Sequence, residues 1–260
     1  MPKSNIHLTF LLIMKTNTKD QDTILVKKED LPRRSFMKFA GMSVASAGLI
    51  MAGCKKKVDD PTPAGPEPAP GAMTPTGINL GSGDIGILNY AYALEQLEAA
   101  FYTTVVADAA FTKTFSEEEQ MMLKDIKAHE IIHREFFKTA LGASAIPGLE
   151  VDFSSITFSN RTSVLATAKA FEDLGVAAYN GAGKLLVNKD YLLLAGKIVS
   201  VEARHASYIR DIINPKSMDF AGADVVGANG LDSALMPFQV LAIAGTYVKT
   251  KINASYLPTA

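Results

Sequence analysis

The chain has 260 residues, of which 48% are hydrophobic and 20% charged, with 26 Lys and Arg against 27 Asp and Glu. This is an ordinary globular composition, which excludes a largely disordered chain and a fibrous repeat. The net charge of -1 provides no basic footprint, so we expect no nucleic-acid partner. The single cysteine excludes an intramolecular disulfide and any metal site built from several cysteines.

The first 54 residues resemble a bacterial export segment. Arg33 and Arg34 lie in Pro-Arg-Arg-Ser-Phe-Met-Lys, which resembles a twin-arginine export signal. The weakly apolar stretch 39–53 follows, and it is shorter than the roughly 20 residues that a membrane-spanning helix needs. It ends in Leu-Ile-Met-Ala-Gly directly before Cys54, which resembles a lipobox, whose cysteine is lipidated and becomes the new N-terminus. The order of these features predicts a twin-arginine lipoprotein signal over residues 1–54, in preference to a buried helix with a stray cysteine.

The next segment, residues 55–83, is predicted to be a tether. It begins with three lysines and continues with Pro, Gly, Ala and Thr, a composition that cannot bury a core. Together, signal and tether predict an exported protein of the periplasm or cell envelope, held at the membrane by lipid on Cys54. The sequence leaves open which membrane carries the lipid and whether translation starts at Met1 or Met14.

Two long helices are predicted in the first half of the remaining chain. Asp84 can cap a helix over residues 85–110, since an aspartate oxygen can accept the free N–H groups of a first turn. The run that begins at Ser116 with Ser-Glu-Glu-Glu matches a capping box and opens a second helix. That helix is expected to end at Leu141, because Gly142 follows it.

Two further long helices are predicted in the second half. One covers residues 162–187, and Asp190 can cap another that ends at Ile213, before an Asn-Pro pair that cannot continue it. The connection between the two pairs of helices, residues 143–161, is longer than the links within each pair. This order predicts an all-α fold, a four-helix bundle with one long crossover.

The bundle is expected to occupy residues 84–214. Residues 215–260 are predicted to form a C-terminal extension that packs on it, with a short helix over residues 238–248. No alternating apolar pattern of comparable length supports a sheet.

A glutamate lies in the middle of every apolar helix stripe, and on two helices a histidine follows it three residues later. Positions i and i+3 share one helix face, so each Glu-His pair can reach one ion. Four carboxylates in a bundle core would repel one another and lose their hydration, and a pair of metal ions removes that cost. The other two glutamates would be able to bridge the ions. The residues are Glu95, Glu130, His133, Glu172, Glu202 and His205.

The two halves of the bundle also look alike. Residues 94–102 align with residues 171–179, and the two Glu-x-x-His pairs align as well. This internal repeat predicts a pseudo-two-fold site in which Glu95 pairs with Glu172. Glu98 then has no acidic mate and is the extra carboxylate.

His129 directly precedes one of the Glu-x-x-His pairs. Its repeat mate is Val201, and its helix face differs from that of the ligands, so both arguments oppose a role as ligand. We expect a surface position or a supporting role for this side chain.

The stretches 88–102 and 201–206 resemble the ferritin-like superfamily, and most closely the bacterial ferritin-like domain proteins that are related to plant desiccation-related proteins. The resemblance covers residues 84–214 and implies a non-haem di-iron centre, or alternatively a di-manganese centre. Carried over by position, it implies the six Glu and His ligands named above, Glu98 as a spare or mobile ligand, and Tyr102 and Tyr179 as candidate catalytic residues that donate to ligand carboxylates.

Two functions are compatible with such a site. The first is redox chemistry with O2 or peroxide, or iron handling, in the manner of a ferroxidase, a peroxidase or a manganese catalase. The second is a non-catalytic envelope protein for stress protection or scaffolding, with a structural or vestigial metal site. The sequence leaves enzymatic activity and oligomeric state open, and a homodimer is one option.

Overall fold

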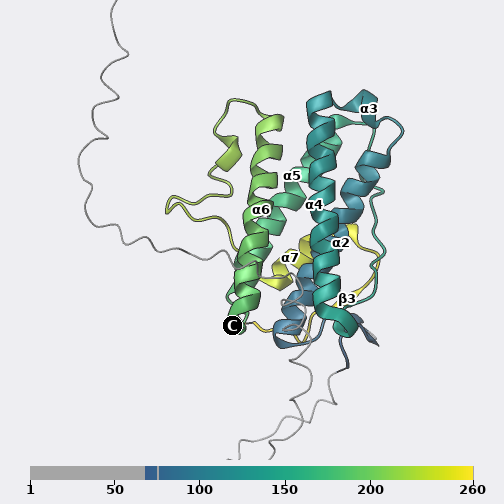
Figure 1. Ribbon diagram of the computed structural model, residues 1–260, viewed down its shortest axis with the longest axis vertical. Coiled ribbons are helices and arrows are strands. Elements are labelled where there is room, and N and C mark those ends of the chain that lie inside the picture. The colour runs from purple at the N-terminus through teal and green to yellow at the C-terminus, as the bar shows by residue number, and fades with distance from the viewer. Residues whose placement is uncertain (1–67, 75, 260) are drawn as a thin grey trace, which may run out of the picture. The chain divides into compact units, whose positions relative to one another are not determined.

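The computed structural model describes residues 68–74 and 76–259, and four long helices dominate this part (Figure 1). They are α2 (Gly83–Ala107), α4 (Glu117–Leu141), α5 (Arg161–Gly183) and α6 (Lys189–Ile213). Helix α2 packs along α4 and α5 packs along α6, and the two hairpins meet where α2 contacts α5. The predicted all-α helical bundle is confirmed.

Shorter helical elements connect and extend the bundle. They are α3 (Phe111–Thr114), η1 (Gly142–Ser144), η2 (Asp219–Ala221), α7 (Pro237–Ala244) and η3 (Gly245–Tyr247). Helix α7 packs against α5, and with η3 it takes the place of the single helix expected over residues 238–248. The predicted capping box at Ser116 is present at the start of α4.

The helix starts differ from the prediction at Asp84. Helix α2 begins after Ser82, and the Asp84 carboxylate instead accepts the backbone N–H groups of Val187 and Asn188, both at 2.8 Å. Asn188, rather than Asp190, caps α6. Asp84 therefore fixes the turn that leads into α6, a long-range contact that local sequence does not reveal.

Two helices also end earlier than predicted. Helix α2 stops at Ala107 because Asp108 is extended and its side chain accepts the N–H of Ala110 at 2.8 Å, which opens α3. Helix α5 stops at Gly183, short of the expected residue 187. The chain after it is held by Asp84 instead of continuing the helix.

Three very short strands, β1 (Met73–Thr74), β2 (Gly77–Asn79) and β3 (Ile252–Asn253), form a small sheet that was not predicted. Strand β2 lies in the middle, antiparallel to β1 and parallel to β3. Strands of two or three residues are too short to show an alternating pattern. Gly77 is needed here, since its φ is +129° and a Cβ would lie 2.3 Å from the carbonyl oxygen of Lys251.

The sheet changes the expected extent of the tether. Ile78 and Leu80 are buried, at 3% and 0% exposure, so the described residues before α2 belong to the packed unit. The tether was expected to reach residue 83 and is shorter than that. Its remaining part, residues 55–67, lies outside the described residues.

Two buried amides on α2 hold the crossover between α4 and α5. Asn89 donates to the carbonyl of Ser144 at 2.8 Å and accepts the N–H of Ile146 at 3.0 Å. Two turns later, Gln96 accepts the N–H of Leu149 at 2.9 Å. These bonds satisfy backbone groups that would otherwise be buried without partners.

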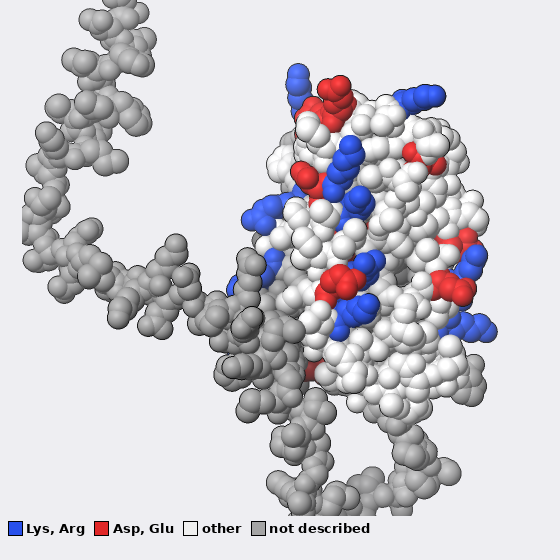
Figure 2. Space-filling model, turned by 45° about the vertical axis from the view of Figure 1, so that its right-hand side comes forward, with Lys and Arg blue, Asp and Glu red and all other residues white. Residues whose placement is uncertain are grey.

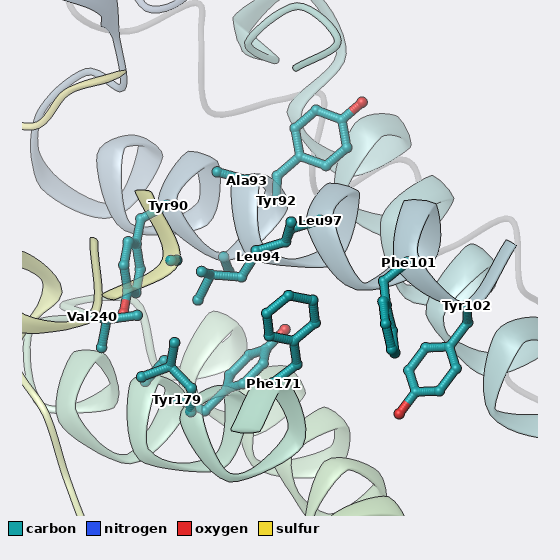
Figure 3. Close-up of a cluster of buried hydrophobic side chains, with 14 of the residues drawn as sticks. Tyr90, Tyr92, Ala93, Leu94, Leu97, Phe101, Tyr102, Phe171, Tyr179 and Val240 are labelled. Atoms are coloured by element: carbon teal, nitrogen blue, oxygen red, sulfur yellow. The ribbon is translucent and has the colours of Figure 1, made fainter. Parts of the chain in front are cut away.

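The hydrophobic core is centred on α2 and α5 and includes buried side chains of α4, α6 and α7; Figure 3 shows part of it. Phe101 of α2 and Phe171 of α5 pack edge to face, with ring centroids 5.1 Å apart. Every residue from Gly86 to Ala99 is buried, because the other long helices cover one side of α2 and the crossover and C-terminal segment cover the other. Helix α2 is thus an interior helix with polar side chains that require partners.

Most charged side chains lie on the surface, where both signs are interspersed on the face that Figure 2 displays. Within the described part of the chain, none of the helices is both long and apolar enough to cross a membrane. Five glutamates, in contrast, are buried inside the bundle. They are Glu95, Glu98, Glu130, Glu172 and Glu202.

Candidate metal centre

Each long helix contributes one fully buried glutamate to the same point of the core. Glu95 of α2, Glu130 of α4, Glu172 of α5 and Glu202 of α6 are all 0% exposed. They lie on the apolar stripes that face the bundle axis, so the packing that buries the stripe also buries the carboxylate. An isolated ionised carboxylate in such a place is very costly, and the arrangement requires compensating charge.

The two histidines of the Glu-x-x-His pairs supply part of that compensation across the bundle. His133 on α4 places Nδ1 2.7 Å from Oε1 of Glu202 on α6. His205 on α6 places Nδ1 2.9 Å from Oε1 of Glu130 on α4. The predicted internal repeat is thus visible as two reciprocal contacts, in which the histidine of α4 contacts the glutamate of α6 and the histidine of α6 contacts the glutamate of α4.

The donor atoms form two groups that share two glutamates. One group contains Glu95, Glu130, His133 and Glu202; the other contains Glu130, Glu172, Glu202 and His205. Both oxygens of Glu130 and of Glu202 are used, one facing each histidine. The shared carboxylates are therefore those of the Glu-x-x-His pairs.

This geometry corrects one expectation. The sequence suggested that Glu95 and Glu172 could bridge two ions, whereas each of them lies in a single group. The reason is helix rotation, because α4 and α6 direct Glu130 and Glu202 between the two histidines. Glu95 and Glu172 approach from α2 and α5 at the outer ends.

The positions of the donor atoms suit the coordination of metal ions better than they suit hydrogen bonds among the side chains themselves. Although both Nδ1 atoms lie close to carboxylate oxygens, eight buried atoms of these six residues form no well-aligned hydrogen bond within the described part, including Nδ1 of both histidines and both oxygens of Glu130 and Glu202. The distances from each Nδ1 to its carboxylate oxygens run from 2.7 to 3.6 Å. Ligands about 2.1 Å from one octahedral ion lie about 3 Å from one another. Oxygen-rich donors with one imidazole per ion suit iron and manganese.

Without metal, the cluster retains protons. Burial raises the pKa of Glu95 and of Glu172 to about 8, despite the opposing effect of the nearby histidines. Burial acts on Glu202 as well, but contact with His133 and His205 outweighs it and lowers that pKa to about 2. Burial disfavours charged histidine, yet the surrounding carboxylates raise the pKa of both histidines to about 12. Metal ions must displace these protons.

The two tyrosines act on the outer glutamates. Tyr102 of α2 donates its hydroxyl to Oε1 of Glu172 on α5 at 2.5 Å, and Tyr179 of α5 donates to Oε1 of Glu95 on α2. In each case the other oxygen, Oε2, stays in its donor group. Both hydroxyls therefore orient the outer carboxylates, which is the donor role that the family resemblance implies.

Glu98 lies apart from both donor groups. It is 4% exposed, and a Cβ on its repeat mate Gly175 would lie only 3.0 Å from its Oε1. Burial, followed by repulsion from Glu130 and Glu202, raises its pKa well above the usual value. The glycine on α5 makes the space that this extra carboxylate occupies.

His129 is exposed, and its Nδ1 lies 2.9 Å from Nε2 of His205. The contact agrees with the supporting role that was one of the two expectations. The sequence shows that His129 lies beside Glu130. It could not predict the contact of His129 with His205, which lies 76 residues further along the chain. Arg33, Arg34 and Cys54 of the predicted signal lie outside the described residues.

Comparison with known proteins agrees with this fold. A family model for the ferritin-like domain matches residues 83–215, from the start of α2 to just beyond the end of α6. The chain therefore belongs to the ferritin-like domain family. No curated protein matches the sequence.

Proposed function

We propose that this protein binds two iron ions per chain, or two manganese ions, at the centre formed by α2, α4, α5 and α6. The observation that carries the proposal is the set of buried donor atoms without hydrogen-bond partners, arranged as two groups that share Glu130 and Glu202. Each group offers one imidazole and three carboxylates. Glu130 and Glu202 would bridge the ions, while Glu95 and Glu172 would each bind one.

Bound iron or manganese supplies one-electron redox chemistry, which supports a reaction with O2 or peroxide, or iron handling. The chain would hold the ions in place and exclude bulk water by burying all four glutamates. Tyr102 and Tyr179 would keep the outer carboxylates oriented. Glu98 is close enough to influence the charge of the site and would act as a spare carboxylate.

The N-terminal sequence supports a cellular location for this centre. The arginine pair Arg33-Arg34, the apolar stretch and Cys54 support export by a twin-arginine route, followed by lipid anchoring in the cell envelope. A twin-arginine route carries folded proteins, so the metal would be loaded before export. The relation to plant desiccation-related proteins and a homodimeric state stay predictions.

One observation favours a second function, a non-catalytic scaffold for the envelope. Without metal, the two histidines lie close to the four glutamates and compensate part of their charge. Such a core can stay folded as an ion-paired cluster, with the metal site structural or vestigial.

Metal content decides between these functions. The full chain would be purified from cells supplied with iron and manganese, beside a Glu130→Gln/Glu202→Gln variant that keeps side-chain volume. The dimetal proposal expects two ions per chain by elemental mass spectrometry and their loss in the variant. Equal metal in both proteins, or none in the unaltered one, would contradict it. Two ions without O2 consumption on adding Fe(II) would favour the structural role.

A further inference from the structure

The two halves of the centre differ at one exposed side chain, His129. It lies on α4, directly before Glu130, and its Nδ1 is 2.9 Å from Nε2 of His205. The two rings are nearly parallel, with an interplanar angle of 8°. The other nitrogen of His205, Nδ1, faces the donor group at 2.9 Å from Oε1 of Glu130. His205 therefore connects the buried cluster to an exposed imidazole.

The other half lacks this connection. The repeat mate of His129 is Val201, one residue before Glu202 on α6, and valine offers no hydrogen-bonding atom in its side chain. Among the described residues, the contacts of His133 with carboxylates all involve Nδ1. The pseudo-two-fold symmetry that relates His133 to His205 thus does not extend to Nε2, the ring nitrogen that faces away from the donor group.

This difference has a chemical consequence through the histidine tautomer. A neutral imidazole has one N–H and one lone pair. If the Nδ1 lone pair of His205 binds a metal ion, the proton must lie on Nε2, which then donates to Nδ1 of His129. The proton of His129 lies on its own Nε2. The hydrogen bond therefore has one direction once metal is bound, and it favours coordination through Nδ1.

We propose that His129 is a positioning residue that holds His205 in the tautomer and ring orientation that bind metal, so that the ion at His205 binds more tightly than the ion at His133. The inference rests on the proposed dimetal function. It adds that the two ions bind in separate steps, in an order set by one residue outside the ligand set.

Three variants of the full chain test this role, with Zn²⁺ as a diamagnetic probe. His129→Val copies the repeat mate and removes the acceptor. His129→Gln keeps an acceptor, since its amide oxygen can accept a hydrogen bond from Nε2–H of His205. Ala128→Val is the matched control, because it adds the same β-branched side chain at the adjacent exposed position. Stepwise Zn²⁺ affinities come from competition with a chromophoric chelator, and ¹⁵N-histidine NMR identifies the protonated ring nitrogen.

The unaltered chain is expected to bind two Zn²⁺ in two separable steps. His129→Val should still bind two, with the tighter step weakened about 10- to 100-fold and the weaker step unchanged. His129→Gln should restore most of the loss, and Ala128→Val should match the unaltered chain. The NMR signal of the proton on Nε2 of His205 should exchange with solvent faster in the valine variant.

Two results would overturn the inference. Unchanged affinities in His129→Val would show that the contact does not act on the metal, while two ions per chain would leave the dimetal function standing. Coordination of His205 through Nε2 would contradict the proposed tautomer. Absence of Zn²⁺ binding by the unaltered chain would reject the dimetal function itself, and this inference with it.

Discussion

At the scale of single residues, the hydroxyls of Tyr102 and Tyr179 determine how the outer glutamates face the centre. Each hydroxyl engages Oε1 of its glutamate and leaves Oε2 for the donor group. A carboxylate without this partner can rotate away, and it loses affinity for the ion even though the ligand itself remains.

We therefore expect Tyr102→Phe to keep the fold and two ions per chain, but to weaken metal binding about 10- to 100-fold. Competition titration against a chelator measures the change. Tyr92→Phe is the matched control, since Tyr92 lies on the same helix and its ring points away from Phe171 and Tyr179 in Figure 3. An equal loss in both variants would mean that the hydroxyl of Tyr102 has no specific effect.

Replacing Glu98 and replacing Glu202 with glutamine should have opposite effects on the stability of the metal-free protein. The pKa of Glu98 is raised, so its contribution to folding stability falls as pH rises above the unfolded pKa, and glutamine removes that penalty. The pKa of Glu202 is lowered to about 2, so its charge stabilises the fold at neutral pH. We expect Glu98→Gln to stabilise the metal-free protein increasingly from pH 5 to 8, and Glu202→Gln to destabilise it.

Urea denaturation with a chelator present measures both effects, and metal analysis accompanies it. Because Glu98 belongs to neither donor group, Glu98→Gln should retain two ions per chain. Loss of one ion would instead make Glu98 a ligand.

The sequence was sufficient to select the six Glu and His residues that come together in the core, because two Glu-x-x-His pairs and two aligned glutamates share helix faces that must meet in a bundle. It could not determine which glutamates are shared. That depends on the rotation of each helix about its axis, which places Glu130 and Glu202 between the histidines. The contact between His129 and His205 depends on the same rotation.

At the scale of elements, the segment after α6 is fastened to α5 by a close backbone approach. The N–H of Leu235 donates to the carbonyl of Ala177 at 2.9 Å. A Cβ on Gly181 would lie 1.8 Å from the Leu235 carbonyl oxygen. Arg210 of α6 adds a clamp, since its guanidinium binds both carboxylate oxygens of Asp224 within 3.0 Å.

Gly181→Ala should therefore destabilise the protein by about 1–3 kcal/mol through overpacking, although alanine is the better helix former. Gly196→Ala, in the middle of α6 with open space around the new Cβ, should stabilise it by about 0.5–1 kcal/mol. Urea denaturation of the two variants compares them directly. A neutral Gly181→Ala would show that the segment can move away without cost.

Helix existence was predictable from apolar periodicity, whereas helix ends were less so. Asp84 resembles a cap for its own helix but binds the chain before α6, because a partner about 100 residues away competes for the carboxylate. The three short strands carry no periodic signal at all. Their pairing depends on which chain segments lie adjacent after the bundle has formed.

At the scale of the whole molecule, metal and protons compete for the same core. Glu95 and Glu172 retain protons up to about pH 8 in the metal-free protein, while their pKa in the unfolded chain is about 4.3. Their contribution to metal-free stability is therefore complete below the unfolded pKa and is lost as pH rises to about 8. Binding of ions requires the same deprotonation, so apparent metal affinity rises over that range.

The increase in melting temperature caused by saturating Mn²⁺ should accordingly grow from pH 6 to pH 8. Thermal unfolding with and without metal measures it, and calorimetry in buffers of different ionisation enthalpy measures the protons released. A metal-induced shift that is independent of pH would contradict the raised pKa of the two outer glutamates.

The parallel pairing of β2 with β3 joins the start of the packed unit to its end, since Ile78 lies beside Ile252. A contact of such sequence separation closes a very long loop, which slows folding relative to local helix pairing. Strand β3 is also synthesised after all four long helices. The packed unit can therefore complete its folding only after the ribosome has made Ile252 and Asn253, and the long helices must remain able to accept this strand until then.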